Sequence, residues 1–238
     1  MIRAVLLDLD DTLLDNDMQQ FLTHYFAALG RRTAQLVAPD QLVSALLAST
    51  RVMMNNHDPN ITNQQAFDAD FFSRLGYPES QVRPIFDFFY EEDFPALKRY
   101  TGVRPQARTL VQTLLERGYD VVIATNPMFP RRAIDHRLEW AGVIDFPFKL
   151  VTSYENSHFC KPNPSYYREI LEKVGCHPQE AIMVGDDWGN DIEPAHQAGL
   201  HTYRLMDTAQ DNTYPTLGFE GTLADCLAWV QSGGLSNL

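Results

Sequence analysis

Two carboxylates stand on one tight turn near the start of the chain, in the run Asp8-Leu-Asp10-Asp-Thr12. The turn directly follows Arg3–Leu7, a compact apolar run that predicts a buried parallel strand. Loops at the carboxyl ends of such strands normally build the active site of an α/β protein, and paired carboxylates there are oxygen ligands for a hard cation. The alternative is a solvated acidic turn in which Thr12 caps the following segment.

Further along the chain, three polar residues have the chemistry to hold a phosphate. Thr125 and Asn126 follow the strand expected over Asp120–Ala124, so a hydroxyl and backbone amides project from the sheet edge that carries Asp8. Lys161 precedes a proline and a helix start, which lets its ammonium reach inward. The alternatives are an ordinary turn for Thr125 and Asn126 and a surface position for Lys161.

A second group of carboxylates, Asp186, Asp187 and Asp191, follows the apolar strand expected over Ala181–Val184. Without a cation, carboxylates brought together would repel one another and their pKa values would rise. Carboxylate oxygens suit Mg²⁺, whereas no cluster of His or Cys suggests zinc. The sequence therefore predicts a magnesium site at the sheet edge.

The elements that must position these residues alternate between helix and strand after about residue 106, as in a doubly wound parallel sheet. The terminal segment Ser232–Leu238, with its paired glycines, is expected to be a loose tail. The expected elements are helices 106–117, 131–140 and 164–174 and strands 120–124, 149–152, 181–184 and 202–205.

Between the first strand and this alternating region, residues 17–97 show helical periodicity. Leu22, Tyr25, Phe26 and Leu29 fall on one helix face, and breaks along the segment leave roughly four helices. We therefore expect an all-helical domain over 17–97 inserted into a core made of 1–16 and 98–238, with a hinge near residues 100–105.

The composition narrows the classes of partner and compartment. The 238 residues, 45% of them hydrophobic, carry a formal net charge of −12, which argues against a nucleic-acid polymer or an anionic membrane as partner. Cys160, Cys176 and Cys226 form no C-x-x-C pair, so neither a disulfide framework nor a thiolate zinc site is expected. No apolar leader is recognised, and a cytoplasmic monomer or homodimer is the expectation.

In this order and spacing, the motifs resemble those of the haloacid dehalogenase (HAD) superfamily, specifically its phosphatase branch with a helical type-1 cap. The resemblance spans nearly the whole chain and implies an α/β fold with a Rossmann-like doubly wound parallel sheet core and an inserted all-helical cap domain. The motifs are Asp8-Leu-Asp-Asp-Thr12, Thr125-Asn126, Lys161-Pro162 and Gly185-Asp186-Asp187 through Asp191.

This resemblance implies two catalytic carboxylates. Asp8 would be the nucleophile that forms an aspartyl-phosphate, and Asp10 would protonate the leaving alkoxide and then deprotonate the attacking water. Mg²⁺ would be held by the carboxylates of Asp8 and Asp186 and by the backbone carbonyl of Asp10. The acidic side chain at Asp10 also argues against dehalogenation, since dehalogenases differ at this place.

The remaining motif residues have implied supporting roles. Thr12, Thr125, Asn126 and Lys161 would bind the phosphoryl group of the substrate. Asp191 would orient Lys161, while Asp187 either binds a metal water or caps the next turn. Asp11 stands where many members carry glycine.

The function implied is a Mg²⁺-dependent phosphatase acting on a small phosphomonoester of the nucleotide, sugar phosphate or phosphoglycolate type. Two alternatives stay open: a sugar phosphomutase with the same Asp8 chemistry, and a catalytically silent scaffold that binds a phosphorylated ligand.

Two features of the helical insertion allow more than one interpretation. Arg51, Asn55, Asn56 and His57 either reach the leaving group or form a solvated loop. The aromatic stretch that includes Phe86, Phe88, Phe89 and Phe94 either forms a dimer surface or packs inside the cap.

Overall fold

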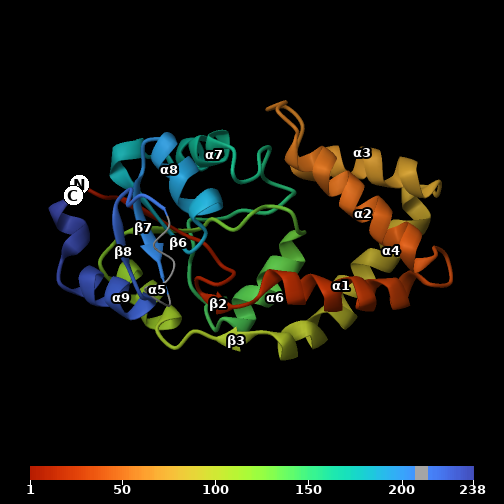
Figure 1. Cartoon of the computed structure of the whole chain (residues 1–238), viewed down its shortest axis with the longest axis horizontal. Coiled ribbons are helices and arrows are strands. Elements are labelled where there is room, and N and C mark those ends of the chain that lie inside the picture. The colour runs from red at the N-terminus through yellow and green to blue at the C-terminus, as the bar shows by residue number, and fades with distance from the viewer. Residues whose placement is uncertain (207–213) are drawn as a thin grey trace.

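The computed structural model describes residues 1–206 and 214–238, and its core is a six-stranded sheet with the order β5-β4-β1-β6-β7-β8 (Figure 1). All five strand pairs are parallel. The predicted Rossmann-like α/β fold is confirmed. The strands are β1 (Ala4–Leu7), β4 (Asp120–Ile123), β5 (Leu150–Val151), β6 (Ala181–Gly185), β7 (His201–Leu205) and β8 (Phe219–Gly221).

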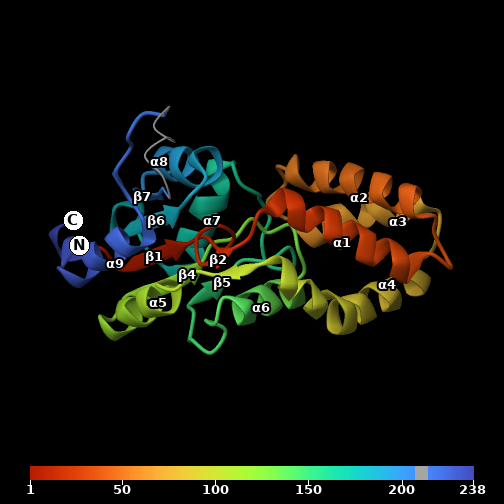
Figure 2. The same cartoon turned by 60° about the horizontal axis from the view of Figure 1, so that its bottom comes forward.

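Helices cover both faces of the sheet because side chains on each strand alternate between two apolar clusters. Val5 and Leu7 of β1 pack on the face covered by α5, α6 and α9, whereas Ala4 and Leu6 pack on the face covered by α7 and α8 (Figure 2). The helices of the core are α5 (Ala107–Glu116), α6 (Arg131–Trp140), α7 (Pro164–Val174), α8 (Glu193–Gln197) and α9 (Leu223–Gln231).

The C-terminal part of the core was not predicted from the sequence. The short edge strand β8 has no buried apolar side chain to produce a recognisable pattern, since Phe219 is 37% exposed. The prediction of a loose tail over Ser232–Leu238 was wrong, because Leu235 is buried in the main core and a 3₁₀ turn spans Gly234–Asn237. Arg117 also donates to the carbonyl of Gln231 at 2.5 Å.

Four helices form the insertion, which lies beyond the carboxyl ends of the strands at one end of the molecule (Figure 1). A π-helical turn and a 3₁₀ segment lead back, and a two-stranded antiparallel ribbon of β2 (Leu14–Asp15) and β3 (Gly102–Val103) joins the outgoing and returning chain. The helices are α1 (Met18–Thr33), α2 (Pro39–Met54), α3 (Asn63–Leu75) and α4 (Glu79–Phe88).

Local sequence signals start and stop these helices. Asp17 caps α1 by accepting from the backbone of Gln19 and Gln20, and Thr62 forms a capping box with Gln65 at the start of α3. Gly76 ends α3 in the left-handed conformation with φ 72°, which glycine adopts without a steric penalty.

The aromatic stretch of the insertion is mainly internal. Phe89 and Phe94 are fully buried, and Phe86 packs against the core that contains Phe71. Phe88 differs, being 49% exposed with the Arg32 guanidinium 4.5 Å from its ring centroid. Packing within the insertion, together with the stacking of Phe94 on Trp140 of α6, thus accounts for most of this stretch.

Within the described ranges 1–206 and 214–238, no helix combines the length and the apolar character that crossing a bilayer requires.

Candidate active site

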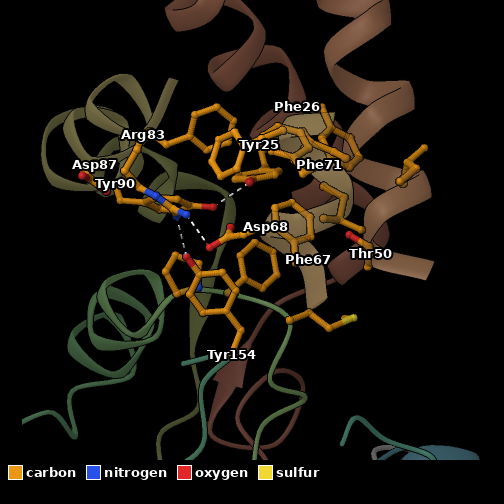
Figure 3. A pocket seen from close by; sticks show the side chains of 18 residues that line it. Tyr25, Phe26, Thr50, Phe67, Asp68, Phe71, Arg83, Asp87, Tyr90 and Tyr154 are labelled. Atoms are coloured by element: carbon orange, nitrogen blue, oxygen red, sulfur yellow. Dashed lines mark hydrogen bonds and ion pairs between the residues drawn. The ribbon is translucent and has the colours of Figure 1, made fainter. Parts of the chain in front are cut away.

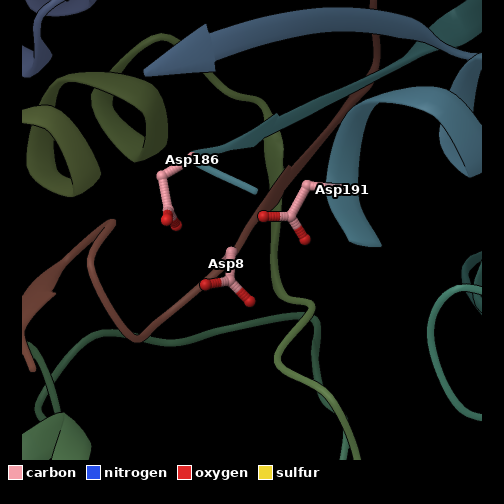
Figure 4. A group of neighbouring side chains, drawn as sticks. All are labelled: Asp8, Asp186 and Asp191. Carbon is pink, nitrogen blue, oxygen red and sulfur yellow. The ribbon is translucent and has the colours of Figure 1, made fainter. Parts of the chain in front are cut away.

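The motif residues meet at the carboxyl edge of three adjacent strands. Asp8 directly follows β1, Thr125 and Asn126 follow β4, and Asp186 follows β6, so the order β4-β1-β6 places them side by side. With Lys161 they line one cavity of about 190 Å³. Figure 4 shows Asp8, Asp186 and Asp191 converging there, with carboxylate oxygens within 4.8 Å of one another.

Lys161 bridges two buried carboxylates. Its Nζ donates to Asp8 Oδ1 at 2.7 Å and to Asp191 Oδ1 at 2.5 Å, and its side chain is only 1% exposed. Burial by itself lowers the pKa of the ammonium, but Asp191 and Asp8 outweigh it and hold the pKa well above its usual value. Lys161 is therefore a fixed positive charge beside Asp8.

Burial raises the pKa of the Asp8 carboxyl well above its usual range, and Asp191, Asp186 and Asp10 raise it further, while Lys161 opposes the shift. These surroundings therefore disfavour the ionised form of Asp8. Additional positive charge at this edge of the sheet would stabilise the ionised carboxylate.

Asp191 is anchored at both oxygens. Oδ1 accepts from Lys161, and Oδ2 accepts from the backbone N–H of Asp187 at 3.2 Å. The carboxylate lies so close over Gly185 that a Cβ there would overlap it, which explains a glycine at the end of β6. Asp187 itself caps the turn Trp188–Ile192 by accepting from the N–H of Asn190 at 2.9 Å.

Asp10 is held by two residues that the sequence did not single out. Asn16 Nδ2 donates to Asp10 Oδ1 at 2.7 Å, and Arg137 Nη1 on α6 donates to Asp10 Oδ2 at 2.5 Å. Arg137 is buried, and its guanidinium lies 4.9 Å from the centroid of the Phe129 ring. No sequence signal marks Arg137, because its helix is an ordinary amphipathic element far along the chain.

The backbone explains Asp11 at a position where glycine is common. Asp11 has φ 53°, in the left-handed region that glycine adopts freely and that aspartate tolerates better than most residues. Its Oδ1 accepts from the N–H of Asn16 at 3.2 Å, which closes the turn around Asp10.

Thr12 lies outside the cavity that the other motif residues line. It is fully buried, and its Oγ1 donates to Asp186 Oδ1 at 3.1 Å. Burial raises the pKa of Asp186 to about 7, with further contributions from Asp191 and Asp11 and an opposing one from the Thr12 hydrogen bond.

The cavity has the donor set for a hard cation. Asp8 and Asp186 each keep one carboxylate oxygen that is not committed to Lys161 or Thr12, whereas both oxygens of Asp191 are already bonded. Both side-chain oxygens of Asp10 are also engaged, which leaves its backbone carbonyl for a metal. Two carboxylates with room for phosphate and water fit Mg²⁺.

The polar break of the insertion lies elsewhere. Arg51, Asn55, Asn56 and His57 are absent from the described lining of this cavity. Asn56 Nδ2 instead donates to the carbonyl of Asp58 at 3.2 Å and to that of Ile61 at 3.1 Å. The insertion contributes Met18 of α1 to the cavity.

Comparison with known families agrees with this arrangement. A model of the haloacid dehalogenase-like hydrolases matches residues 2–199. The chain belongs to this family. The match includes every motif that the sequence analysis used for the resemblance, so the predicted membership of the HAD superfamily is confirmed.

Two relatives align with this HAD-like hydrolase over most of both chains. The pyrophosphatase PpaX of Oceanobacillus iheyensis is 22% identical over 219 residues, which cover 90% of this chain and 87% of the relative. The glyceraldehyde 3-phosphate phosphatase of Methanopyrus kandleri is 29% identical over 212 residues, covering 86% and 84%.

Solved structures share the fold of this HAD-like hydrolase at low identity. A HAD phosphatase from Thermococcus onnurineus superimposes with a TM-score of 0.61 at 21% identity, covering 96% of this chain and 98% of the other. A 2-haloacid dehalogenase from Pseudomonas syringae gives 0.66 at 21% identity, covering 98% and 100%. Because one fold serves both reactions, the residues of the site must decide the chemistry.

Proposed function

We propose that this HAD-like hydrolase is a Mg²⁺-dependent phosphatase that hydrolyses a small phosphomonoester through an aspartyl-phosphate on Asp8. The observation that carries the proposal is Asp8 held by the buried Lys161 at 2.7 Å, beside a second carboxylate, Asp10, with its own buried partners. Relatives that align over most of the chain carry phosphatase names, which supports the same class of reaction.

In the first step a carboxylate oxygen of Asp8 attacks phosphorus, and the bond from phosphorus to the ester oxygen breaks. Asp10 gives its proton to the departing alkoxide. In the second step Asp10 takes a proton from water, the water oxygen attacks phosphorus, and the bond to Asp8 breaks to release phosphate. One carboxyl group thus serves as acid and then as base.

The other residues stabilise charge on the phosphoryl oxygens. Lys161 and Thr125 would hold them, and Asn126, whose Oδ1 accepts from the N–H of Lys161 at 3.2 Å, keeps its side-chain amide available as a donor. Asp8, Asp186 and the Asp10 carbonyl would hold Mg²⁺, which when bound neutralises negative charge on the phosphoryl group. Thr12 and Asp191 would act through Asp186 and Lys161, which they orient.

For the insertion, we propose that residues 17–97 act as a cap over a core of residues 1–16 and 98–238. The ribbon of β2 and β3 lies where the chain leaves and re-enters the core, which suits a hinge. Met18, at the first position of α1, lines the cavity with Asp8, so movement of the insertion would change access to the nucleophile.

The test of the function is phosphate release from nucleoside monophosphates, sugar phosphates and phosphoglycolate with Mg²⁺ or with EDTA. Release that requires Mg²⁺ supports the phosphatase. Conversion of one sugar phosphate into its isomer without phosphate release supports the mutase, and tight binding without turnover supports the silent scaffold.

Magnesium should stabilise the protein more at pH 8 than at pH 6. Asp186, with its pKa raised from 3.8 to about 7, keeps its proton in the fold at pH 6, so a cation must displace that proton; at pH 8 the carboxylate is free to bind. Between pH 3.8 and 7 the folded state binds more protons than the unfolded state, so the stability from this group falls as pH rises. Bound Mg²⁺ restores the stability that ionisation of Asp186 removes. Its affinity should be about tenfold weaker at pH 6 than at pH 8.

Thermal unfolding at both pH values, in EDTA and in a Mg²⁺ series, measures this difference. The Asp186→Asn variant is the control, because it should lose the Mg²⁺-induced rise in Tm at both pH values. Equal Mg²⁺ affinity at pH 6 and pH 8 in the unmodified protein would argue that no proton on Asp186 competes with the cation, and an unchanged Mg²⁺ effect in Asp186→Asn that Asp186 is not a ligand.

Replacement of Arg137 by methionine should lower kcat by roughly 100-fold and leave KM within a few-fold, because Asp10 would lose the hydrogen bond that fixes its orientation. Arg137→Lys should recover part of the loss. Arg131→Met, at a 48% exposed position of the same helix, is the control for helix stability. A rise in KM with unchanged kcat would instead mean that Arg137 binds substrate.

A further inference from the structure

A second cavity, of about 140 Å³, lies between the insertion and the core, and half of the residues that line it are aromatic. Rings from α1, α3, α4 and the segment after α4 line it together with rings from the core loops that follow β4 and β5. Figure 3 shows Tyr25, Phe67, Phe71 and Tyr90 of the insertion with Tyr154 of the core. We refer to it as the aromatic cavity. Its ring-bearing residues are Tyr25, Phe26, Phe67, Phe71, Phe72, Phe86, Tyr90, Phe129 and Tyr154.

The size of the aromatic cavity matches one small ring. An apolar cavity of about 150 Å³ in another protein binds benzene. Aromatic walls add edge-to-face contacts to the burial of apolar surface. Among the lining rings, Phe67 and Phe71 are stacked with centroids 5.0 Å apart, and the Tyr25 ring lies 5.5 Å from that of Phe129.

The aromatic cavity adjoins the cavity of Asp8. Met128 and Phe129 line both cavities, so the loop after β4 forms a shared wall. On α1, Met18 lines the cavity of Asp8 and Leu22 lines the aromatic cavity. Residues four apart on a helix are separated by about one turn, roughly 5–6 Å. The two cavities are therefore neighbours, and a leaving group that extended from Asp8 past the loop after β4 would reach the rings.

The charges of the aromatic cavity disfavour an anionic leaving group. Its lining carries two carboxylates, Asp68 and Asp87, against the guanidinium of Arg83. In the aromatic cavity, Arg83 Nη2 lies 2.5 Å from Asp68 Oδ2 and 2.9 Å from Glu79 Oε1. A carboxylate or second phosphate that entered the aromatic cavity would meet two like charges and a guanidinium already bonded to carboxylates.

Polar groups in the lining of the aromatic cavity offer hydrogen bonds to a neutral ring. Asp68 Oδ1 is buried without a partner of standard hydrogen-bond geometry, although the Gln64 side chain lies near this carboxylate. The hydroxyls of Tyr25 and Tyr90 lie 2.8 Å apart. A ring with an N–H or O–H donor would satisfy the Asp68 oxygen.

We propose that the substrate is a phosphomonoester whose leaving group is a neutral alcohol with a single ring of about the size of benzene. This ring enters the aromatic cavity. This inference rests on the proposed phosphatase function and narrows its substrate class. The class excludes leaving groups with their own negative charge, such as glycolate or phosphate.

Steady-state hydrolysis of benzyl phosphate, ethyl phosphate and phosphoglycolate tests the proposal, since all three release a primary alcohol. We expect kcat/KM for benzyl phosphate to exceed that for ethyl phosphate by about 10- to 100-fold, with phosphoglycolate no better than ethyl phosphate. A higher kcat/KM for phosphoglycolate than for benzyl phosphate, or equal values for benzyl and ethyl phosphate, overturns the inference. Either result still supports the phosphatase. No turnover of the three, with phosphate released from other compounds of the wider panel, overturns the inference alone; no release from any compound overturns both.

A ring placed inside the aromatic cavity should remove the preference. Thr50 lines this cavity from α2, so Thr50→Trp should lower the ratio of kcat/KM for benzyl over ethyl phosphate by at least tenfold. The ratio does not depend on the fraction of folded enzyme, so partial misfolding would not mimic the effect. Thr23→Trp, at an exposed position of α1, is the matched control and should keep the ratio. An unchanged ratio in Thr50→Trp contradicts the proposal.

Discussion

Asp8→Asn should reduce phosphate release by roughly 10⁴-fold or more, because the amide cannot form the aspartyl-phosphate on which both chemical steps depend. The variant should nevertheless fold. Burial and the neighbouring carboxylates already disfavour the ionised form of Asp8, so a neutral side chain of the same shape is tolerated there. Initial rates and thermal unfolding, measured on the same preparation, separate these two effects.

Asp40→Asn is the matched control for the Asp8 variant, since Asp40 is exposed in the first turn of α2 and should leave the rate unchanged. Acid quench during turnover of a phosphorus-labelled substrate should trap label on the unmodified chain and on none of the Asp8→Asn chain. Residual activity within tenfold of the unmodified enzyme would assign the nucleophile to another group.

The convergence of Asp8, Thr125, Asn126 and Asp186 was predictable from local sequence. Each residue directly follows an apolar run, and adjacent parallel strands bring their carboxyl ends to one edge whatever the lengths of the connections between them. Lys161 was harder to place, because it follows no strand directly. Its inward direction was inferred from the proline and helix start that come next.

The partners of Asp10 could not be predicted, because their contacts depend on tertiary packing. Arg137 lies 127 positions from Asp10 in the sequence, and nothing in its helix distinguishes it from an exposed arginine. Asn16 sits in a turn whose geometry follows from the positive φ of Asp11. Both residues became recognisable only when the fold placed α6 and the turn on either side of one carboxylate.

The aromatic cavity was not predicted from the sequence, for a different reason. Polar residues in a helical break were considered as substrate contacts, whereas the aromatic cavity is built from rings that periodicity assigns to a hydrophobic core. A helical pattern does not distinguish a ring that fills a core from one that borders a cavity. Only the volume enclosed between the insertion and the core makes the distinction.

Lys161→Met should abolish activity and also destabilise the protein. The substitution keeps the apolar length of the side chain but leaves Asp8 and Asp191 buried without their shared cation. Removal of one partner from a buried ion pair costs about 3–5 kcal/mol, and for a chain of this size that corresponds to a fall in Tm of roughly 6–20 °C. Loss of the charge near the phosphoryl oxygens should lower kcat by roughly 10³-fold.

Thermal unfolding with and without Mg²⁺ distinguishes this electrostatic effect from simple loss of packing. A cation held by Asp8 and Asp186 would replace part of the missing positive charge, so Mg²⁺ should raise the Tm of Lys161→Met by more than it raises that of the unmodified protein. Lys149→Met, at a 49% exposed position, should change neither Tm nor rate appreciably. A Lys161→Met protein with unchanged stability would mean that Asp8 and Asp191 take up protons at little cost, and the lysine would then serve catalysis alone.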